Sequence, residues 1–367
     1  MKRNLLSKSI AGISGLFLLT LASLTIVITA NGAEANTNIS VSVSLQQKPS
    51  DLLGGFQRAI CYSGFRHGQH PDRGDGAANP SDKEILEDLQ TLSQQCKFGL
   101  IRLYDAQANS EAVLRLISAN KLKLKVLLGA WLDAEVCNPN CPWLKQSLSP
   151  AVLETNKLKN AKEVERTIRL ANQYSNIVVA VAAGNEMLVD WNDHMVPVES
   201  VIRYVRTVKK SIHQPVTVCE NYNWWAHHGA ALAKELDFIS VHTYPIWEKQ
   251  DIDEAMPFTL ANLQAVRNAI PHSRMVITEA GWATVASEFG PRADEARQKR
   301  YYHDLFAWTD KMNITTFFFE AFDEDWKGNP NDPLGAEKHW GLFTVDRKPK
   351  QVIRDLHPDR APVKAVK

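Results

Sequence analysis

The stretch NIVVAVAAGNE, Asn176–Glu186, joins an unbroken apolar run to a polar pair. The run Ile177–Ala183 contains only small or branched apolar residues with no polar alternation. This pattern is typical of a strand that is buried on both faces, as in a parallel sheet. A carboxylate at the end of such a strand is costly unless it faces a cleft. We therefore expect Glu186 to have a chemical role.

A second stretch, RMVITEAGW over Arg274–Trp282, has the same construction. An apolar strand again runs into a glutamate, Glu279, which is followed by a glycine and a tryptophan. Two buried strands that each deliver one glutamate at their carboxyl ends indicate a pair of carboxylates facing one another.

Strand-like and helix-like segments alternate along the chain from Phe56 onward. The strands are predicted over Phe56–Ser63, Phe98–Asp105, Leu122–Trp131, Asn176–Glu186, Pro215–Asn223, Leu236–Tyr244, Arg274–Trp282 and Thr315–Asp323. A first helix is predicted after the capping pair Ser81 and Glu84. Others are expected over Glu111–Asn120, Ala161–Tyr174, Val198–Ile212, around His228–Glu235, over Thr259–Ile270 and over Asp294–Met312.

Eight strand–helix units in about 300 residues predict an α/β fold, a single-domain (β/α)₈ TIM barrel. A doubly wound open sheet is the alternative. It would want a glycine-rich phosphate turn after the first strand, and the stretch GFRHGQH at that place is not one.

Polar side chains gather at the carboxyl ends of the predicted strands, where barrels of this kind build their sites. They are Arg102, Tyr104, Asp105, Asn185, Glu186, Glu220, His242, Tyr244, Glu279, Trp282, Glu320, Asp323 and Glu324. Two carboxylates across a barrel mouth, with no cysteine nucleophile, fit acid/base glycoside hydrolysis. Asn185 is expected to hold a sugar hydroxyl and Tyr244 to hold the ionised Glu279, whereas His242 is expected to be structural.

Aromatic side chains near the strand-end loops would stack on sugar rings. The candidates are Trp224, Trp225, Trp247, Trp282, Trp326 and Trp340, about half of which are expected to pack in the core. The glutamate pair supplies both proton and nucleophile, so no cofactor and no metal are expected.

Five segments, in order and at the right strand ends, resemble glycoside hydrolase family 17. They are IRLYDA (Ile101–Ala106), AGNE (Ala183–Glu186), ITEAGW (Ile277–Trp282), FEAFDEDWKG (Phe319–Gly328) and EKHWGLF (Glu337–Phe343). That family contains β-1,3-glucanases and related β-1,3-glucan transglycosylases. The resemblance runs from about Phe56 to Phe343.

The resemblance implies roles for single residues. Glu186 matches the family's acid/base and Glu279 its nucleophile. The substrate-binding residues that it implies or that we expect beside the pair are Tyr104, Asn185, Tyr244, Trp282, Glu324, Lys327 and Glu337. The chain departs from plant members at Glu320-Ala321, at Ala283-Thr284, in GFRHGQHPDRGDG and in the CNPNC loop.

These features together predict a retaining hydrolase that cleaves β-1,3-glucosidic bonds of β-glucan by double displacement, with carboxyl groups about 5–5.5 Å apart. Three alternatives stay open: a β-1,3-glucan transglycosylase, a non-catalytic glucan-binding barrel, and an enzyme that cuts β-1,4-linked chains. Because net charge is +1 and no basic patch is evident, nucleic acid is not an expected partner. We expect a monomer.

The amino terminus reads as a targeting segment. Lys2, Arg3 and Lys8 precede the largely apolar run Ile10–Ala30, and Ala33-Glu34-Ala35 offers a cleavage site. We expect a signal peptide over residues 1–35, with an uncleaved anchor as the alternative. The protein is then secreted or periplasmic, and meets a membrane only if the segment is retained. A linker over 36–53, a catalytic domain over 54–356 and a flexible tail over 357–367 are predicted.

Five cysteines follow this segment, a number that fits either a disulfide or isolated thiols. In an exported protein Cys137 and Cys141 could close a small loop. A zinc site would need more ligands than this stretch shows. Cys61, Cys96 and Cys219 lie in or beside predicted core elements and are expected to be buried thiols.

Overall fold

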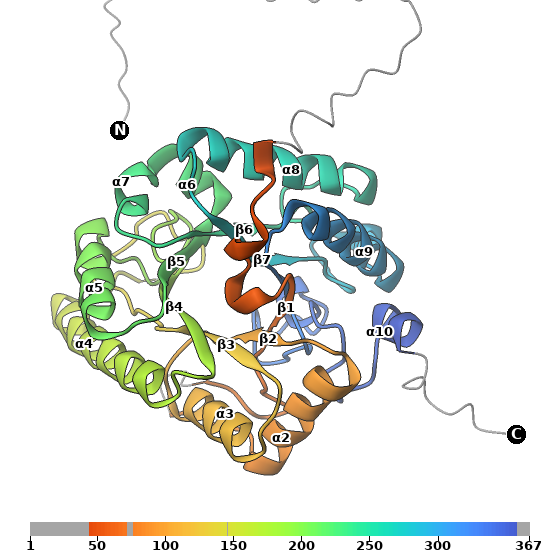
Figure 1. The fold of residues 1–367 in the computed structure, drawn as a ribbon, viewed down its shortest axis with the longest axis horizontal. Helices are drawn as coiled ribbons and strands as arrows, with labels where there is room; N and C mark the ends of the chain where they lie inside the picture. Colours follow the sequence, from red (N-terminus) through yellow and green to blue (C-terminus); the bar gives the residue numbers. More distant parts are fainter. Residues whose placement is uncertain (1–43, 72–75, 145, 358–367) are drawn as a thin grey trace, which may run out of the picture. The chain divides into compact units, whose positions relative to one another are not determined.

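The computed structural model describes residues 44–71, 76–144 and 146–357. Within them, eight parallel strands form a closed barrel in chain order, with β1 pairing with both β2 and β8 (Figure 1). The strands are β1 (Arg58–Cys61), β2 (Leu100–Arg102), β3 (Lys125–Gly129), β4 (Val178–Asn185), β5 (Val216–Asn221), β6 (Ile239–Thr243), β7 (Met275–Gly281) and β8 (Thr316–Phe319). The predicted (β/α)₈ barrel is confirmed, and each predicted strand is present with shorter bounds.

Helices surround the strands on the outside of the barrel (Figure 1). They are α2 (Asp82–Gln90), α3 (Ala108–Ala119), α4 (Pro150–Gln173), α5 (Val198–Ser211), α6 (Tyr222–His228), α7 (Ala230–Ala233), α8 (Ile252–Ala269), α9 (Glu295–Met312) and α10 (Gln351–Leu356). The predicted cap of α2 is present. The Ser81 side chain accepts a hydrogen bond from the backbone nitrogen of Glu84, and the Glu84 side chain accepts one from the backbone nitrogen of Ser81.

Helices α4 and α8 begin well before their predicted starts. Helix α4 starts at Pro150 because Ser149 caps it and proline suits the first helical position. Helix α8 starts at Ile252, capped by Asp251, and contains Pro257. Sequence patterning missed both starts. In α4 the early apolar residues Val152 and Leu158 are exposed and form no buried stripe, and in α8 the internal Pro257 suggests a break.

The strands carry the core because both of their faces are covered. All seven residues of β7 are buried, and in β4 only Val179 and Asn185 are partly exposed. Closing a sheet into a barrel turns one face toward the packed interior and the other toward the helices. The unbroken apolar runs therefore position their terminal glutamates at one rim.

The segment 44–55 packs against the opposite end of the barrel and crosses over its centre (Figure 1). Leu45 and Leu53 are buried, and the Gln47 side chain donates to the carbonyl oxygen of Met275 at 2.9 Å. The backbone nitrogen of Leu53 donates to Thr315 Oγ1 at 2.7 Å. The predicted linker over 36–53 is thus wrong for its described part, whose two leucines close the barrel.

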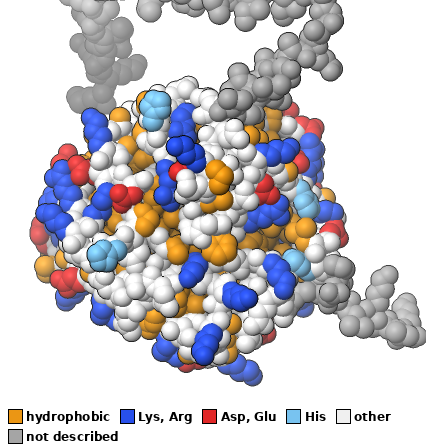
Figure 2. Space-filling model, in the orientation of Figure 1, with side chains coloured by type: hydrophobic (Ala, Val, Ile, Leu, Met, Phe, Trp, Pro, Cys, Tyr) orange, Lys and Arg blue, Asp and Glu red, His pale blue; other side chains and the backbone are white. Residues whose placement is uncertain are grey.

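The predicted signal segment, the rest of that linker and the tail after residue 357 lie outside the described residues. Among the residues that are described, no helix is long and apolar enough to cross a membrane. Figure 2 shows basic and acidic side chains interspersed over the same face of the molecule as Figure 1.

All five cysteines are free thiols, so the loop-closing disulfide is not formed. Cys137 Sγ instead accepts a hydrogen bond from the backbone nitrogen of Leu148 at 3.0 Å. Cys141 is buried and is not bonded to Cys137. The three core cysteines are buried as predicted.

Candidate active site

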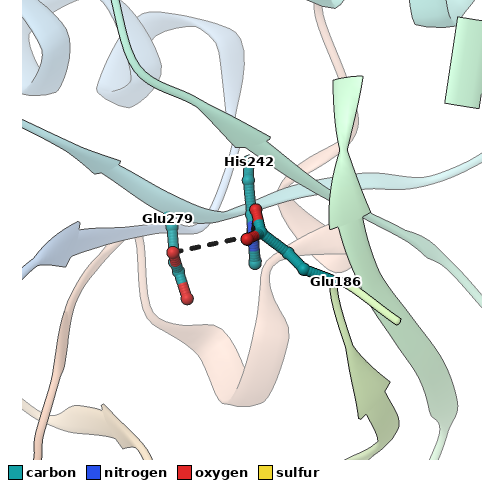
Figure 3. A group of neighbouring side chains, drawn as sticks. All are labelled: Glu186, His242 and Glu279. Atoms are coloured by element: carbon teal, nitrogen blue, oxygen red, sulfur yellow. Dashed lines mark hydrogen bonds and ion pairs between the residues drawn. The ribbon is translucent and has the colours of Figure 1, made fainter. Parts of the chain in front are cut away.

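Glu186, His242 and Glu279 converge at the carboxyl ends of β4, β6 and β7 (Figure 3). His242 Nδ1 lies 2.8 Å from Glu186 Oε1 and 3.6 Å from Glu279 Oε2. One carboxylate oxygen from each glutamate and one nitrogen of the ring all lie within 4.8 Å of one another. The barrel therefore brings the two predicted carboxylates together.

The backbone at the end of β4 turns sharply to present Glu186. Its φ is 47°, a left-handed conformation that is unusual for a residue other than glycine, and its nitrogen donates to the carbonyl of Cys219 at 2.9 Å. The side chain of Glu186 is 25% exposed, whereas that of Glu279 is 7% exposed. The first carboxylate thus faces the open rim and the second lies deeper.

Four side chains stabilise the ionised form of Glu279. Arg102 Nη1 donates to Oε1 at 2.6 Å, Tyr104 donates to the same oxygen at 3.1 Å, and Tyr244 donates to Oε2. Burial alone would raise the pKa of Glu279, but His242, Arg102 and the two tyrosines outweigh it and lower the pKa. Glu279 is therefore held as a carboxylate.

Arg102 connects four strands beneath the rim. Besides Glu279 it contacts the Asn185 side-chain oxygen, and its Nη1 lies 3.1 Å from the Thr278 carbonyl oxygen and 3.2 Å from His242 Nε2. Its side chain is 1% exposed. Asn185 is therefore fixed by Arg102 immediately before Glu186.

Burial alone would lower the pKa of His242, but Glu279 and Glu186 outweigh it and raise the pKa to about 10. The three convergent residues could be considered as metal ligands. A metal would need an unprotonated ring nitrogen between the carboxylates, and the positive Arg102 already lies against Glu279. The group fits a hydrogen-bonded catalytic cluster better than a metal centre.

Glu220 is a buried carboxyl group below the turn that carries Glu186. Its Oε1 accepts from the backbone nitrogen of Leu188 at 2.7 Å and its Oε2 from that of Asn221 at 3.3 Å. Burial and the neighbouring Glu186 raise the pKa of Glu220 well above its usual value.

Lys327 lies between two fully buried carboxylates rather than free in the cleft. Its Nζ is 2.8 Å from Glu320 Oε2 and 2.6 Å from Glu324 Oε2. Burial raises the pKa of Glu320 well above its usual value, with Glu324 adding to the effect and Lys327 opposing it. Glu324 also accepts from Ser63 at 2.5 Å and is 0% exposed. The prediction that Glu324 touches substrate is therefore wrong, and Glu320 is a salt-bridged supporting group.

Glu337 is partly exposed and lies close enough to Glu186 and Glu279 to be influenced by their charges. Burial raises the pKa of its carboxyl group; Lys327 opposes this effect, while Glu186 and Glu279 add to it. Of the predicted substrate-binding residues, Tyr104, Asn185, Tyr244, Lys327 and Glu337 are all partly exposed around the pair.

The prediction that Trp282 binds substrate is also wrong. The side chain is 0% exposed, its Nε1 donates to the Arg292 carbonyl oxygen at 2.9 Å, and its ring packs 5.8 Å from that of Tyr301. Trp225 and Trp340 are buried as well. Side chains alternate between the two faces of a strand, so Trp282, three residues after Glu279, is directed toward α9, where Tyr301 lies.

The sequence model of the BtgE/BtgC glycoside hydrolase domain matches residues 59–341. The chain belongs to this family. The match runs from the second residue of β1 to beyond β8, so the BtgE/BtgC domain contains every side chain of the site described above.

Two relatives of this BtgE/BtgC domain are both named for 1,3-beta-glucosidase activity on glucan. A glucan 1,3-beta-glucosidase of Arthroderma benhamiae is 25% identical over 270 residues, 68% of this chain and 78% of the relative. A putative glucan endo-1,3-beta-glucosidase btgC of Aspergillus niger is 26% identical over 304 residues, 75% of this chain but 40% of the relative. The matched part is therefore less than half of the btgC protein.

Two solved structures share the fold. An endo-laminarinase from Formosa has a TM-score of 0.68 and 25% identity, covering 84% of this chain and 87% of that one. A glycoside hydrolase family 17 β-1,3-glucanosyltransferase from Rhizomucor miehei has a TM-score of 0.60 and 21% identity, covering 83% and 97%. The similarity to the Rhizomucor structure shows only that the two chains share the barrel fold.

Three functional candidates were missed or undervalued in the sequence: Arg102, His242 and Glu220. Each is a charged or titratable side chain near the end of an otherwise apolar strand, which is the signal that singled out Glu186 and Glu279. What the sequence lacked was the register between strands, which brings these side chains to one point.

Proposed function

We propose that this chain is a retaining β-1,3-glucan hydrolase in which Glu279 is the nucleophile and Glu186 the general acid and base. The observation that carries the proposal is the asymmetric carboxylate pair. One member is buried and kept ionised by Arg102, Tyr104 and Tyr244, while the other is partly exposed at the rim.

In the first step Glu279 attacks the anomeric carbon while Glu186 gives its proton to the glycosidic oxygen. The leaving chain departs with a new hydroxyl group, and the remaining chain is bound to Glu279 as an ester. Glu186, now ionised, takes a proton from water, whose oxygen attacks the same carbon and releases Glu279. When a sugar hydroxyl replaces water, the product is a longer glucan.

The closeness of the carboxylates supports retention. Retaining enzymes place their carboxyl groups about 5–5.5 Å apart, whereas inverting enzymes leave about 6.5–9.5 Å for a water molecule. The oxygens of Glu186 and Glu279 that face His242 lie within 4.8 Å of each other.

The substrate class rests on the relatives. The Arthroderma, Aspergillus and Formosa proteins are named for β-1,3-glucan or laminarin, and the Formosa enzyme is similar over most of both chains. Transglycosylation by the same centre is the second candidate. Secretion is part of the proposal and rests on the Lys- and Arg-flanked apolar segment before residue 35. All side chains of the described site come from one chain, which supports action as a monomer.

Product analysis tests the proposal. Wild type and Glu279→Gln are incubated with linear β-1,3-gluco-oligosaccharides and, in parallel, with cello-oligosaccharides. We expect the wild type to shorten only the β-1,3 series and the variant to shorten neither. Products longer than the substrate would identify the transglycosylase. Turnover of cello-oligosaccharides alone would refute the substrate class, and no turnover of either would refute the activity.

A further inference from the structure

Two aromatic rings stack at the rim beside the acid/base, outside the contacts already described. The rings of Trp131, which follows β3, and His194 lie 4.6 Å apart with an angle of 32° between their planes. Trp131 is 36% exposed, whereas Trp225, Trp282 and Trp340 are buried. An indole held by a neighbouring ring yet open to solvent at a catalytic rim is a ready surface for a ligand.

This pair is tied directly to the turn that presents Glu186. His194 Nε2 lies 2.9 Å from the backbone carbonyl oxygen of Asn185, and its Nδ1 lies 2.9 Å from Asp193 Oδ1. Both ring nitrogens of His194 therefore have partners, which fixes the ring plane against Trp131 and its distance from the acid/base.

A second exposed indole extends the surface. Trp143, in the loop after β3, is 56% exposed and lies within hydrogen-bonding reach of Asp193. The His194 contact lowers the pKa of Asp193; burial opposes this effect, and Trp143 adds a smaller lowering contribution. An ionised carboxylate between two aromatic groups could accept hydrogen bonds from sugar hydroxyls.

The position in the barrel decides which part of a substrate this surface meets. In the closed order β1 to β8, strand β3 is four strands from β7, which carries the nucleophile, and one strand from β4, which leads to the acid/base. The general acid protonates the bond on the leaving-group side, so a surface beyond Glu186 faces the leaving chain.

We propose that Trp131 and His194, extended by Trp143, form an acceptor-side platform that binds glucosyl rings of the leaving chain and of an incoming acceptor chain. The inference rests on the proposed function and assigns a binding site to it. A β-linked glucosyl ring presents axial C–H groups on its faces and hydroxyls at its edge. Those features match flat aromatic faces beside the Asp193 carboxylate.

The test compares a substrate that fills the acceptor side with one that cannot. β-Laminaribiosyl fluoride loses only fluoride and reaches no acceptor subsite, whereas laminarihexaose does. For Trp131→Ala we expect kcat/KM on laminarihexaose to fall about tenfold, as loss of one aromatic stacking contact allows, and kcat/KM on the fluoride to change less than about twofold. For Trp131→Phe we expect a kcat/KM on laminarihexaose between those of the wild type and Trp131→Ala.

Transfer from the fluoride to added laminaritriose should drop with Trp131→Ala and, less strongly, with Trp143→Ala. Trp308→Phe, a half-buried tryptophan on α9, is the control and should change neither substrate. Equal effects of Trp131→Ala on both substrates, or no effect on either, would overturn the platform. Failure of the wild type on both substrates would instead overturn the proposed function.

Discussion

Arg102 Nη1 donates to Glu279 Oε1 at 2.6 Å, and both side chains are almost completely buried. Burying a charged pair costs desolvation free energy, and this cost is offset only when each charge is well hydrogen-bonded. Here the two tyrosine hydroxyls and the Asn185 oxygen add hydrogen bonds to the pair, although Arg102 Nε has no partner among the described residues. The arrangement keeps Glu279, the proposed nucleophile, ionised and fixes its orientation.

Arg102→Lys tests that contact. A lysine keeps the charge but cannot reach Glu279 and Asn185 together with a planar fork. We expect kcat to fall about 10²–10³-fold, the range for loss of one oriented donor in a catalytic site. Arg58→Lys, in an exposed pair with Asp310 at the other end of the barrel, is the matched control and should leave kcat unchanged. Equal effects would refute the role.

Tyr244→Phe should change the pH dependence. The hydroxyl stabilises ionised Glu279, so removing it raises the pKa of that carboxylate. Because the reaction needs the ionised form, the acid limb of kcat/KM should move to higher pH. Tyr104→Phe, which removes a 3.1 Å bond, should move it less. An acid limb that stays in place or moves to lower pH would contradict the assignment.

Glu220→Gln should weaken acid catalysis. Both side-chain oxygens of Glu220 accept hydrogen bonds from backbone nitrogens, of Leu188 and Asn221. A glutamine side chain has only one such oxygen, so its NH₂ group must face one of these two backbone N–H groups and would disturb the turn at Leu188. We expect laminarihexaose turnover to fall about ten- to hundredfold, part of the 10²–10⁴ that a general acid supplies. Laminaribiosyl fluoride, whose leaving group needs little protonation, should be affected much less.

The control for that variant is Glu163→Gln, another buried glutamate that accepts a backbone N–H, from Ala106. It should lower the free energy of unfolding without separating the two substrates. If both variants behaved alike, Glu220 would be structural only.

Lys327→Met should destabilise the fold. It leaves Glu320 and Glu324 buried without their cation, a change that costs about 3–5 kcal/mol in unfolding free energy. Adding Glu320→Gln should restore part of the loss. Lys157→Met, in an exposed pair with Glu154, should change denaturant unfolding by less than about 1 kcal/mol. A loss no larger than that of the exposed control would show that Lys327 is not a structural cation.

The barrel and the convergence of Glu186 and Glu279 could be predicted because their signals are local. An unbroken apolar run ending in a glutamate is visible in Ile177–Glu186 without knowledge of any other strand. The roles of Arg102 and His242 could not be read in that way, since they depend on which strand ends meet.

Other errors have equally physical causes. Leu45 and Leu53 lie in a polar stretch, so two leucines that close the barrel looked like parts of a linker. Trp282 follows Glu279 closely in sequence, yet its side chain is buried beside Tyr301. Burial depends on three-dimensional neighbours that residue type alone does not specify.

Trapping of the glycosyl-enzyme tests the central claim most directly. The protein is incubated with 2-deoxy-2-fluoro-β-laminaribiosyl fluoride, which slows both formation and hydrolysis of the glycosyl ester and favours its accumulation. The protein is then digested, and the masses of the peptides are measured by mass spectrometry. We predict one modified peptide, labelled at Glu279, and no label in Glu279→Gln. A label on another residue, or turnover with inverted products and no label, would contradict the account.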